Sequence, residues 1–105
     1  MAFQSIETQI LNRLVKDILK AGYLVHVMDG EEFVLRDSNS FVKIRKAMES
    51  TDEDYLFLKR DGQNIGWVRL IYGNDNDVIS DYTSVDEIEA IIDPIYKDID
   101  TFENK

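Results

Sequence analysis

The sequence predicts an α+β domain in which an antiparallel sheet of about five strands carries its helices on one face. Three observations support this fold class. Apolar residues recur at helical spacing near both ends of the chain, strand-like alternation fills much of residues 23–82, and two Asp-Gly pairs divide that alternation into hairpins. The predicted order is α-β-β-α-β-β-β-α. We expect residues 1–105 to form one domain.

The first predicted helix runs from about residue 6 to about residue 21. Apolar side chains recur there at three- and four-residue steps, and charged side chains fill the other face. Ser5 is suited to the N-cap, and Gly22 is suited to the position after the C-cap. A short basic helix is predicted over residues 41–49.

The last predicted helix begins at Ser84, where Ser84 and Glu87 have the spacing of a capping box. Its apolar stripe consists of isoleucines and Val85. Pro94 lacks an amide hydrogen, so the helix is expected to kink there or to restart with Asp93 as a new cap.

The first predicted hairpin joins residues 23–28 to residues 31–36 through Asp29-Gly30, a typical two-residue turn. Closing the chain at that turn predicts two apolar faces. One contains Val25, Val27 and Val34, and the other contains Leu24, His26, Met28, Phe33 and Leu35.

The second predicted hairpin joins residues 54–60 to residues 65–72 through Asp61-Gly62, and a short strand follows over residues 78–82. Trp67 is expected to be a core anchor, with an interface role as the alternative. The face toward the helices would then hold Leu56, Leu58, Ile65, Trp67 and Ile71, and the opposite face Tyr55, Phe57, Val68, Leu70 and Tyr72. An apolar face of that size needs a cover.

The net charge of −9 is unevenly distributed along the chain. Residues 1–72 contain ten bases and eleven acids, whereas residues 73–105 contain two bases and ten acids. Binding to a phosphate backbone needs clustered lysine and arginine, so this balance argues against direct nucleic-acid binding. A positively charged partner would be attracted instead.

The composition excludes several further classes of site. Without cysteine, the chain has no disulfide framework, no cysteine–zinc site and no thiol nucleophile. No stretch approaches the roughly 18 apolar residues of a membrane span, and polar residues interrupt the amino-terminal segment where a signal peptide would be apolar. We therefore expect a cytoplasmic protein without a membrane segment or a cofactor.

His26 and the turn at Asn74–Asp77 are the two places to look for chemistry. His26 is the only histidine, and it could act as a general base only if a nucleophile or substrate converged on it, so a structural or surface role is favoured. Asp75, Asp77 and Ser80 lack the ligand order of a calcium loop, so the turn is interpreted as a connection between strands. We expect no catalytic and no metal-binding residue.

The acids near the carboxyl end lie mostly off the isoleucine stripe and are expected to form a solvated band. They are Asp86, Glu87, Glu89, Asp93, Asp98, Asp100 and Glu103. The simpler interpretation is solubility, with the first acids also complementing the helix dipole. The alternative is an array that imitates phosphates and occupies the basic groove of a nucleic-acid-binding protein.

Several segments resemble stretches of small uncharacterised proteins encoded by bacteriophages and prophages. They are Gly66-Trp67-Val68-Arg69, Tyr72-Gly73-Asn74-Asp75, residues 77–83, residues 51–55 and residues 29–32. The resemblance extends over about two thirds of the chain and implies no particular activity or catalytic residue. It implies an accessory protein that acts by binding a host protein.

The sequence therefore favours a small, acidic, non-enzymatic module that binds a protein partner. Two surfaces are candidates: the acidic band, through Asp86, Glu89, Asp93 and Asp98, and the uncovered sheet face, through Tyr55, Phe57 and Tyr72. An uncovered face would also favour a homodimer. The alternatives are an acidic nucleic-acid mimic that inhibits a DNA- or RNA-binding protein and, less favoured, a small enzyme that uses His26 and nearby carboxylates.

Overall fold

The computed structural model describes residues 5–49, 52–73 and 77–98. The elements follow the predicted order and confirm the α+β fold class. They are α1 (Ile6–Lys20), β1 (Leu24–Asp29), β2 (Glu32–Ser38), α2 (Phe41–Ala47), β3 (Glu53–Arg60), β4 (Gln63–Ile71), β5 (Ile79–Tyr82) and α3 (Asp86–Lys97).

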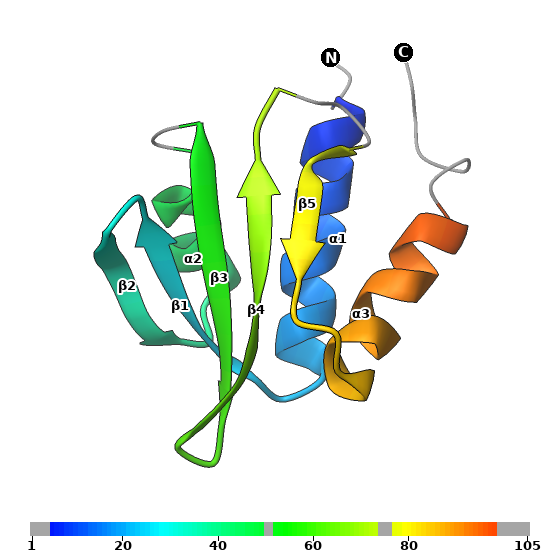
Figure 1. Cartoon of the computed structure of the whole chain (residues 1–105). Coiled ribbons are helices and arrows are strands. Elements are labelled where there is room, and N and C mark those ends of the chain that lie inside the picture. The colour runs from blue at the N-terminus through cyan, green and yellow to red at the C-terminus, as the bar shows by residue number, and fades with distance from the viewer. Residues whose placement is uncertain (1–4, 50–51, 74–76, 99–105) are drawn as a thin grey trace.

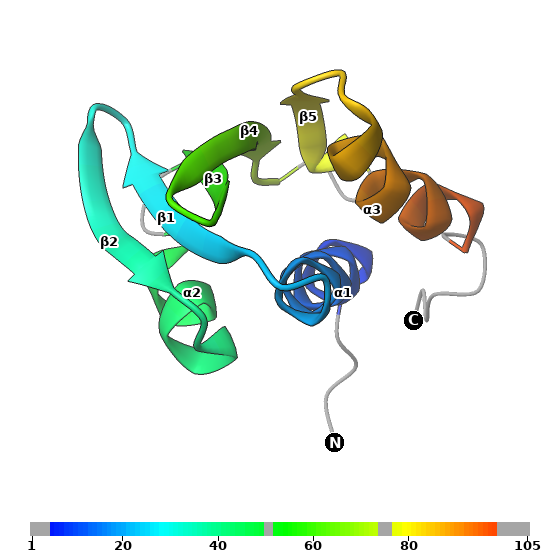
Figure 2. The same ribbon diagram turned by 90° about the horizontal axis from the view of Figure 1, so that it is seen from below.

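The strands form one antiparallel sheet in the order β2-β1-β3-β4-β5. All three helices lie on the same side of this sheet, with α1 between α2 and α3 (Figures 1 and 2). The opposite side, which faces the viewer in Figure 1, is covered by no helix of the described chain. We call it the open face.

The boundaries of α1 follow the predicted caps. The Ser5 side chain accepts a hydrogen bond from the Thr8 amide, and Gly22 has a φ of 93°. The Tyr23 amide donates to the carbonyl of Ile18 across that glycine, as in a Schellman motif. In α2, Ser40 caps the amide of Lys43, and Ile44 is buried.

The predicted capping box of α3 does not form. Val85 is the N-cap and makes no side-chain capping bond, whereas the Ser84 hydroxyl lies 3.3 Å from a carboxylate oxygen of Glu89. Of the two outcomes expected at Pro94, a kink or a restart at Asp93, the restart does not occur, because α3 is continuous through Pro94. Pro94 has no amide hydrogen to donate to the carbonyl of Ala90, as a residue in a regular helix would. Both residues are exposed, so water can solvate that carbonyl.

The core between the sheet and the helices is almost entirely aliphatic. Its fully buried residues include Leu11, Leu14, Val15 and Ile18 of α1, Val25 and Val27 of β1, Leu56 and Leu58 of β3, Leu70 of β4, and Ile88, Ile92 and Ile95 of α3. The covered face of the sheet is therefore the face lined by valine and leucine.

An irregularity in the second hairpin decides which face of β4 is buried. Asp61 and Gly62 have φ angles of 54° and 76°, as a type I′ turn requires, and Arg60 pairs with Gln63 across the turn. The register then shifts, so that Leu58 pairs with Gly66 and Leu56 with Val68. A regular hairpin would have paired Leu56 with Trp67.

This bulge overturns the predicted faces of β4. One extra residue moves every later side chain of the strand to the other side of the sheet. Val68 and Leu70 are buried against the helices, whereas Trp67 and Ile71 lie on the open face. The prediction that Trp67 anchors the core is therefore wrong.

A similar shift occurs in the first hairpin. Asp29 pairs with Glu32 and Met28 with Phe33, but Val27 then pairs with Leu35 rather than with Val34. Leu35 packs against the core, and Val34 is 46% exposed. The faces predicted for Val34 and Leu35 are thus interchanged, again because one extra residue enters the strand.

Candidate protein-binding face of the sheet

A continuous row of rings crosses four strands of the open face. It consists of Phe33 on β2, His26 on β1, Tyr55 and Phe57 on β3, and Trp67 on β4. Adjacent ring centroids are 5.6 Å apart for three of the contacts and 6.2 Å apart for Tyr55–Phe57. Edge-to-face and offset contacts at these separations are favourable. We call these five residues the aromatic row.

Apolar neighbours extend the aromatic row on the same face. Met28 pairs with Tyr55 across β1 and β3, and Leu24 and Ile71 lie on the open side of their strands. None of these three belongs to the hydrophobic core or packs against it. Leu24 and Phe33 are 36% and 38% exposed. The open face thus combines aromatic and aliphatic surface that no described element covers.

Charged groups of both signs lie along the margin of the open face. Arg69 donates a short hydrogen bond to the carboxylate of Glu53 on the neighbouring strand, which raises the pKa of Arg69. Asp81 pairs with Arg69 in register, from β5. The guanidinium of Arg36 lies 4.4 Å from the ring centre of Phe33. The margin is therefore mixed in charge, whereas the chain as a whole is strongly acidic.

His26 is part of the aromatic row, and its environment favours a structural role. Its Nδ1 accepts a hydrogen bond of 2.7 Å from the backbone amide of Asp37. In the neutral imidazole this leaves the proton on Nε2 and no free lone pair for general-base chemistry. The side chain is only 12% exposed. His26 holds the irregular strand β2 against β1.

Tyr72 is the one aromatic residue of the predicted face that lies elsewhere. It is on the helix side, where its hydroxyl donates to Oδ2 of Asp54, and that oxygen also accepts the Glu49 amide at 2.9 Å. Tyr72 shares the side of Val68 and Leu70, so the bulge in β4 that misled the prediction for those residues also misled it for Tyr72.

Asp54 is a fully buried carboxyl group. Its Oδ1 has no hydrogen-bond partner among the described residues. Burial raises the pKa of Asp54, and burial together with the Asp54 contact raises the pKa of Tyr72. The pair ties the end of α2 to the sheet.

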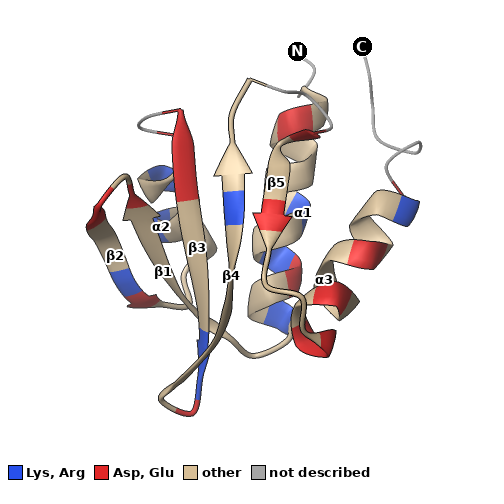
Figure 3. Cartoon of the chain, viewed as in Figure 1, with Lys and Arg blue, Asp and Glu red and all other residues tan. Residues whose placement is uncertain are grey.

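The predicted acidic band follows α3, which lies to the side of the sheet, next to β5, in the view of Figure 3. Asp86 and Asp93 are exposed. Glu89 is half-buried beside Ser84, and Asp98 lies 3.1 Å from a guanidinium nitrogen of Arg13 on α1. Asp98 therefore fastens α3 to α1, and it contributes less free charge than the sequence predicts. The rest of the predicted band, Asp100 and Glu103, lies outside the described residues.

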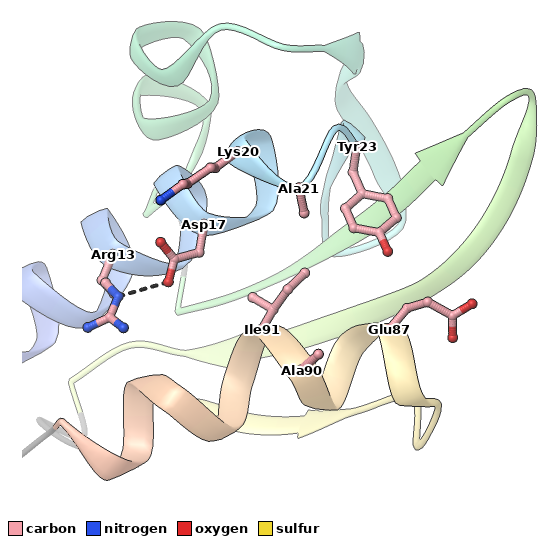
Figure 4. A pocket seen from close by; sticks show the side chains of 8 residues that line it. All are labelled: Arg13, Asp17, Lys20, Ala21, Tyr23, Glu87, Ala90 and Ile91. Atoms are coloured by element: carbon pink, nitrogen blue, oxygen red, sulfur yellow. Dashed lines mark hydrogen bonds and ion pairs between the residues drawn. The ribbon is translucent and has the colours of Figure 1, made fainter.

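A groove of about 470 Å³ runs between α1 and α3 (Figure 4). It is lined by Arg13, Asp17, Lys20, Ala21, Tyr23, Glu87, Ala90 and Ile91. Arg13 donates to Asp17 at 2.8 Å, and this hydrogen bond is the main reason that its pKa is raised. The groove mixes both charges, and its arginine is already paired with carboxylates from both helices.

Within the described ranges, no three histidine or acidic side chains are arranged to hold a metal ion. Most of the Asn74–Asp77 turn lies outside those ranges, so its predicted role as a connection stays a prediction. No helix among the described residues is long and apolar enough to span a membrane.

Comparisons of the chain with protein-family models, with curated protein sequences and with solved structures find no match.

The sequence prediction missed Trp67 and Ile71 as members of the open face, although a usable signal was present. On β3 the core-facing residues Leu56 and Leu58 are aliphatic, and the alternating residues are aromatic. Extending that segregation to β4 would have assigned Val68 and Leu70 to the core and Trp67 to the open face.

Proposed function

We propose that this protein is a non-enzymatic binding module of the cytoplasm that recognises protein surfaces through the open face. The observation that carries the proposal is the aromatic row, which joins four strands on the side of the sheet that no described helix covers. Aromatic residues flanked by arginine are typical of the energetically dominant parts of protein interfaces. The resemblance to phage accessory proteins adds an expectation that a bacterial host protein is among the partners.

The contacts within the aromatic row favour a protein partner over a single-stranded nucleic acid. Stacked bases require free ring faces and a basic groove. Here the rings engage one another, with interplanar angles of 77° for His26–Phe33 and 68° for Tyr55–Trp67, and the chain carries a net charge of −9. A protein surface can fill such an uneven apolar face without bringing phosphates to it.

A second candidate function is imitation of a nucleic acid by α3. It is supported by the exposure of Asp86, Glu87 and Asp93 along one helix. Such binding would weaken steeply as salt rises, because it depends on attraction between charged surfaces. Binding through the open face depends mainly on apolar contact and would weaken little.

The test compares three tagged proteins as baits in a bacterial lysate, with bound proteins identified by mass spectrometry. They are the wild type, the open-face variant Phe33→Ser/Trp67→Ser, and the control Val42→Ser. Val42 is 70% exposed on α2, so the control removes an apolar group from the helix side at little cost to the fold. Circular dichroism checks that all three are folded.

We expect some lysate proteins to bind the wild type and the Val42→Ser control but not the open-face variant. Partners that all three baits retain at low salt and release at high salt would instead support the α3 candidate. Binding of a labelled single-stranded oligonucleotide that depends on Trp67 would contradict the preference for protein.

A further inference from the structure

We propose that a second copy of this chain binds the open face, so that two protomers pack sheet against sheet about a two-fold axis. This inference rests on the proposed function, since it names a partner for the same surface. Its support comes from the placement of charge, from the area of the face and from the irregular sheet edge.

The first support is the charge distribution. Two chains of net charge −9 repel each other, so a homodimer is favoured where the acids of the two copies remain far apart. The acids of α3 lie to the side of the sheet, past β5, and not among the strands of the open face (Figure 3). The charges on the margin of the open face nearly cancel. Glu53 and Asp81 are negative, and Lys59, Arg69 and Arg36 are positive. Contact through the open faces therefore keeps the acidic helices on the outside.

The balanced margin also suits two-fold symmetry. In such an interface residue i of one copy meets residue j of the other, and the reverse contact forms as well. Glu53 and Arg69 are adjacent and opposite in charge, and each side chain is more than a third exposed. A second Glu53–Arg69 pair can meet them with each charge opposite its complement.

The second support is area. β3 and β4 contain eight and nine residues, which corresponds to about 26 to 30 Å of strand. The aromatic row crosses four strands, a width of about 19 Å. Two copies would bury at most about 1,000 to 1,150 Å² in total, close to the lower limit for a specific interface. We therefore expect a reversible dimer of micromolar affinity.

The third support is the poor suitability of the sheet edge for self-association. β2 is an edge strand, but its register shifts twice against β1, and Asp37 has a φ of 48°. Bulges and charged residues on an edge strand disfavour pairing with another strand. β5, at the other edge, has only four residues. Contact between faces is therefore favoured over contact between edges.

The test is sedimentation of the intact protein from about 1 μM to about 1 mM, at low and high salt. We expect the weight-average mass to rise from 12.2 kDa toward twice that value. Association should strengthen severalfold with salt, because screening reduces the repulsion between two acidic chains. Fluorescence of Trp67, the only tryptophan, should shift to shorter wavelength over the same range of concentration.

Charge substitutions at the centre of the aromatic row identify the surface. Phe57→Asp and Phe57→Lys should each be monomeric, since like charges would meet near the axis, and an equimolar mixture of the two should associate again. Recovery in the mixture excludes simple misfolding of either variant. The matched control Val42→Asp should dimerise like the wild type.

A mass of one chain at all concentrations and both salts would overturn the inference. Dimerisation that survives in both separate Phe57 variants would also overturn it, because another surface would then form the contact. If neither Phe57 variant folds, the wild-type Trp67 fluorescence decides: dimerisation without a shift overturns the inference. The lysate experiment tests the proposed function separately. If the wild type is monomeric in sedimentation but the open-face variant still loses lysate partners, the dimer is rejected and the proposed function stands.

Discussion

The two faces of this sheet are built from alternating residues of the same strands, yet they are packed in different ways. The covered face is aliphatic, and Leu56, Leu58 and Leu70 are fully buried beneath the helices. On the open face, Tyr55, Phe57 and Trp67 are half-buried because they cover one another. Aliphatic side chains that interlock with helices provide stability, whereas flat rings that lie side by side leave an apolar surface available for a partner.

The largest effect that tests this contrast is a pair of neighbouring truncations on β3. Leu56→Ala should lower the free energy of unfolding by about 3 kcal/mol, because it removes a fully buried side chain and leaves a cavity. Phe57→Ala should cost about 1 kcal/mol, since its ring is partly in solvent already. Urea unfolding of both variants measures the difference, and equal costs would show that the open face is as essential to the fold as the core.

A second prediction concerns Gly66, a residue of the bulged strand that packs against Ile88 of α3. A Cβ at this position would lie 2.4 Å from Cδ1 of Ile88 and 3.0 Å from Thr83. Gly66→Ala should therefore destabilise the protein by about 1 to 3 kcal/mol through overpacking.

Ile88→Val removes the methyl group in conflict with that Cβ and provides the control. The double variant Gly66→Ala/Ile88→Val should lose less free energy of unfolding than the two single variants lose together. Strict additivity in urea unfolding would mean that the Ile88 contact is not the source of the cost.

A third prediction concerns Asp54, whose pKa is raised by burial. The folded state then holds a proton that the unfolded state releases at lower pH. The stabilising contribution of the protonated Asp54 carboxyl is complete at pH values below its pKa in the unfolded state. It is lost as pH rises through its pKa in the folded state, with a slope of at most about 1.4 kcal/mol per pH unit.

Asp54→Asn removes this titration and should flatten the corresponding part of the stability profile. Urea unfolding of both proteins across pH measures the difference between the two profiles. A wild-type stability that rises relative to Asp54→Asn over that interval would mean that the carboxylate form is the favoured one.

The smallest expected effect is on the outer surface of α3. Neutralising Asp86, Glu89 and Asp93 with Asn or Gln should cost about 1 kcal/mol or less, chiefly through the lost interaction of the first-turn acids with the helix dipole. Association of the chain with itself should be slightly stronger at low salt, because each copy carries less negative charge. Sedimentation of this variant beside the wild type measures that change, and weaker association would place α3 within the interface.

The caps and turns explain why much of the fold could be predicted from the sequence. Ser5, Gly22 and Asp61-Gly62 act locally, so the interactions that define them lie within a few residues of each other. The alternation of apolar residues likewise identified the strands and placed Tyr55 and Phe57 on the open face.

The position of the bulge in β4 depends on information that is not local. A bulge adds one residue to β4, and nothing in the turn itself announces it. Its position follows from the packing of Gly66 beneath Ile88 and from the hydrogen bond between the Trp67 amide and Thr83, both of which involve segments far along the chain. Trp67 and Tyr72 were therefore assigned to the wrong sides.

The bulge opposite Leu58 also leaves the second hairpin with one residue, Ile65, that its ladder does not pair. Deleting Ile65 would make the ladder regular while Val68, Leu70 and Trp67 kept their present partners and sides. Adding one residue to β4 would instead need a second bulge, or it would exchange the inside of the strand for its outside. Deletions of one codon that arise in this hairpin during evolution should therefore be tolerated better than insertions of one codon.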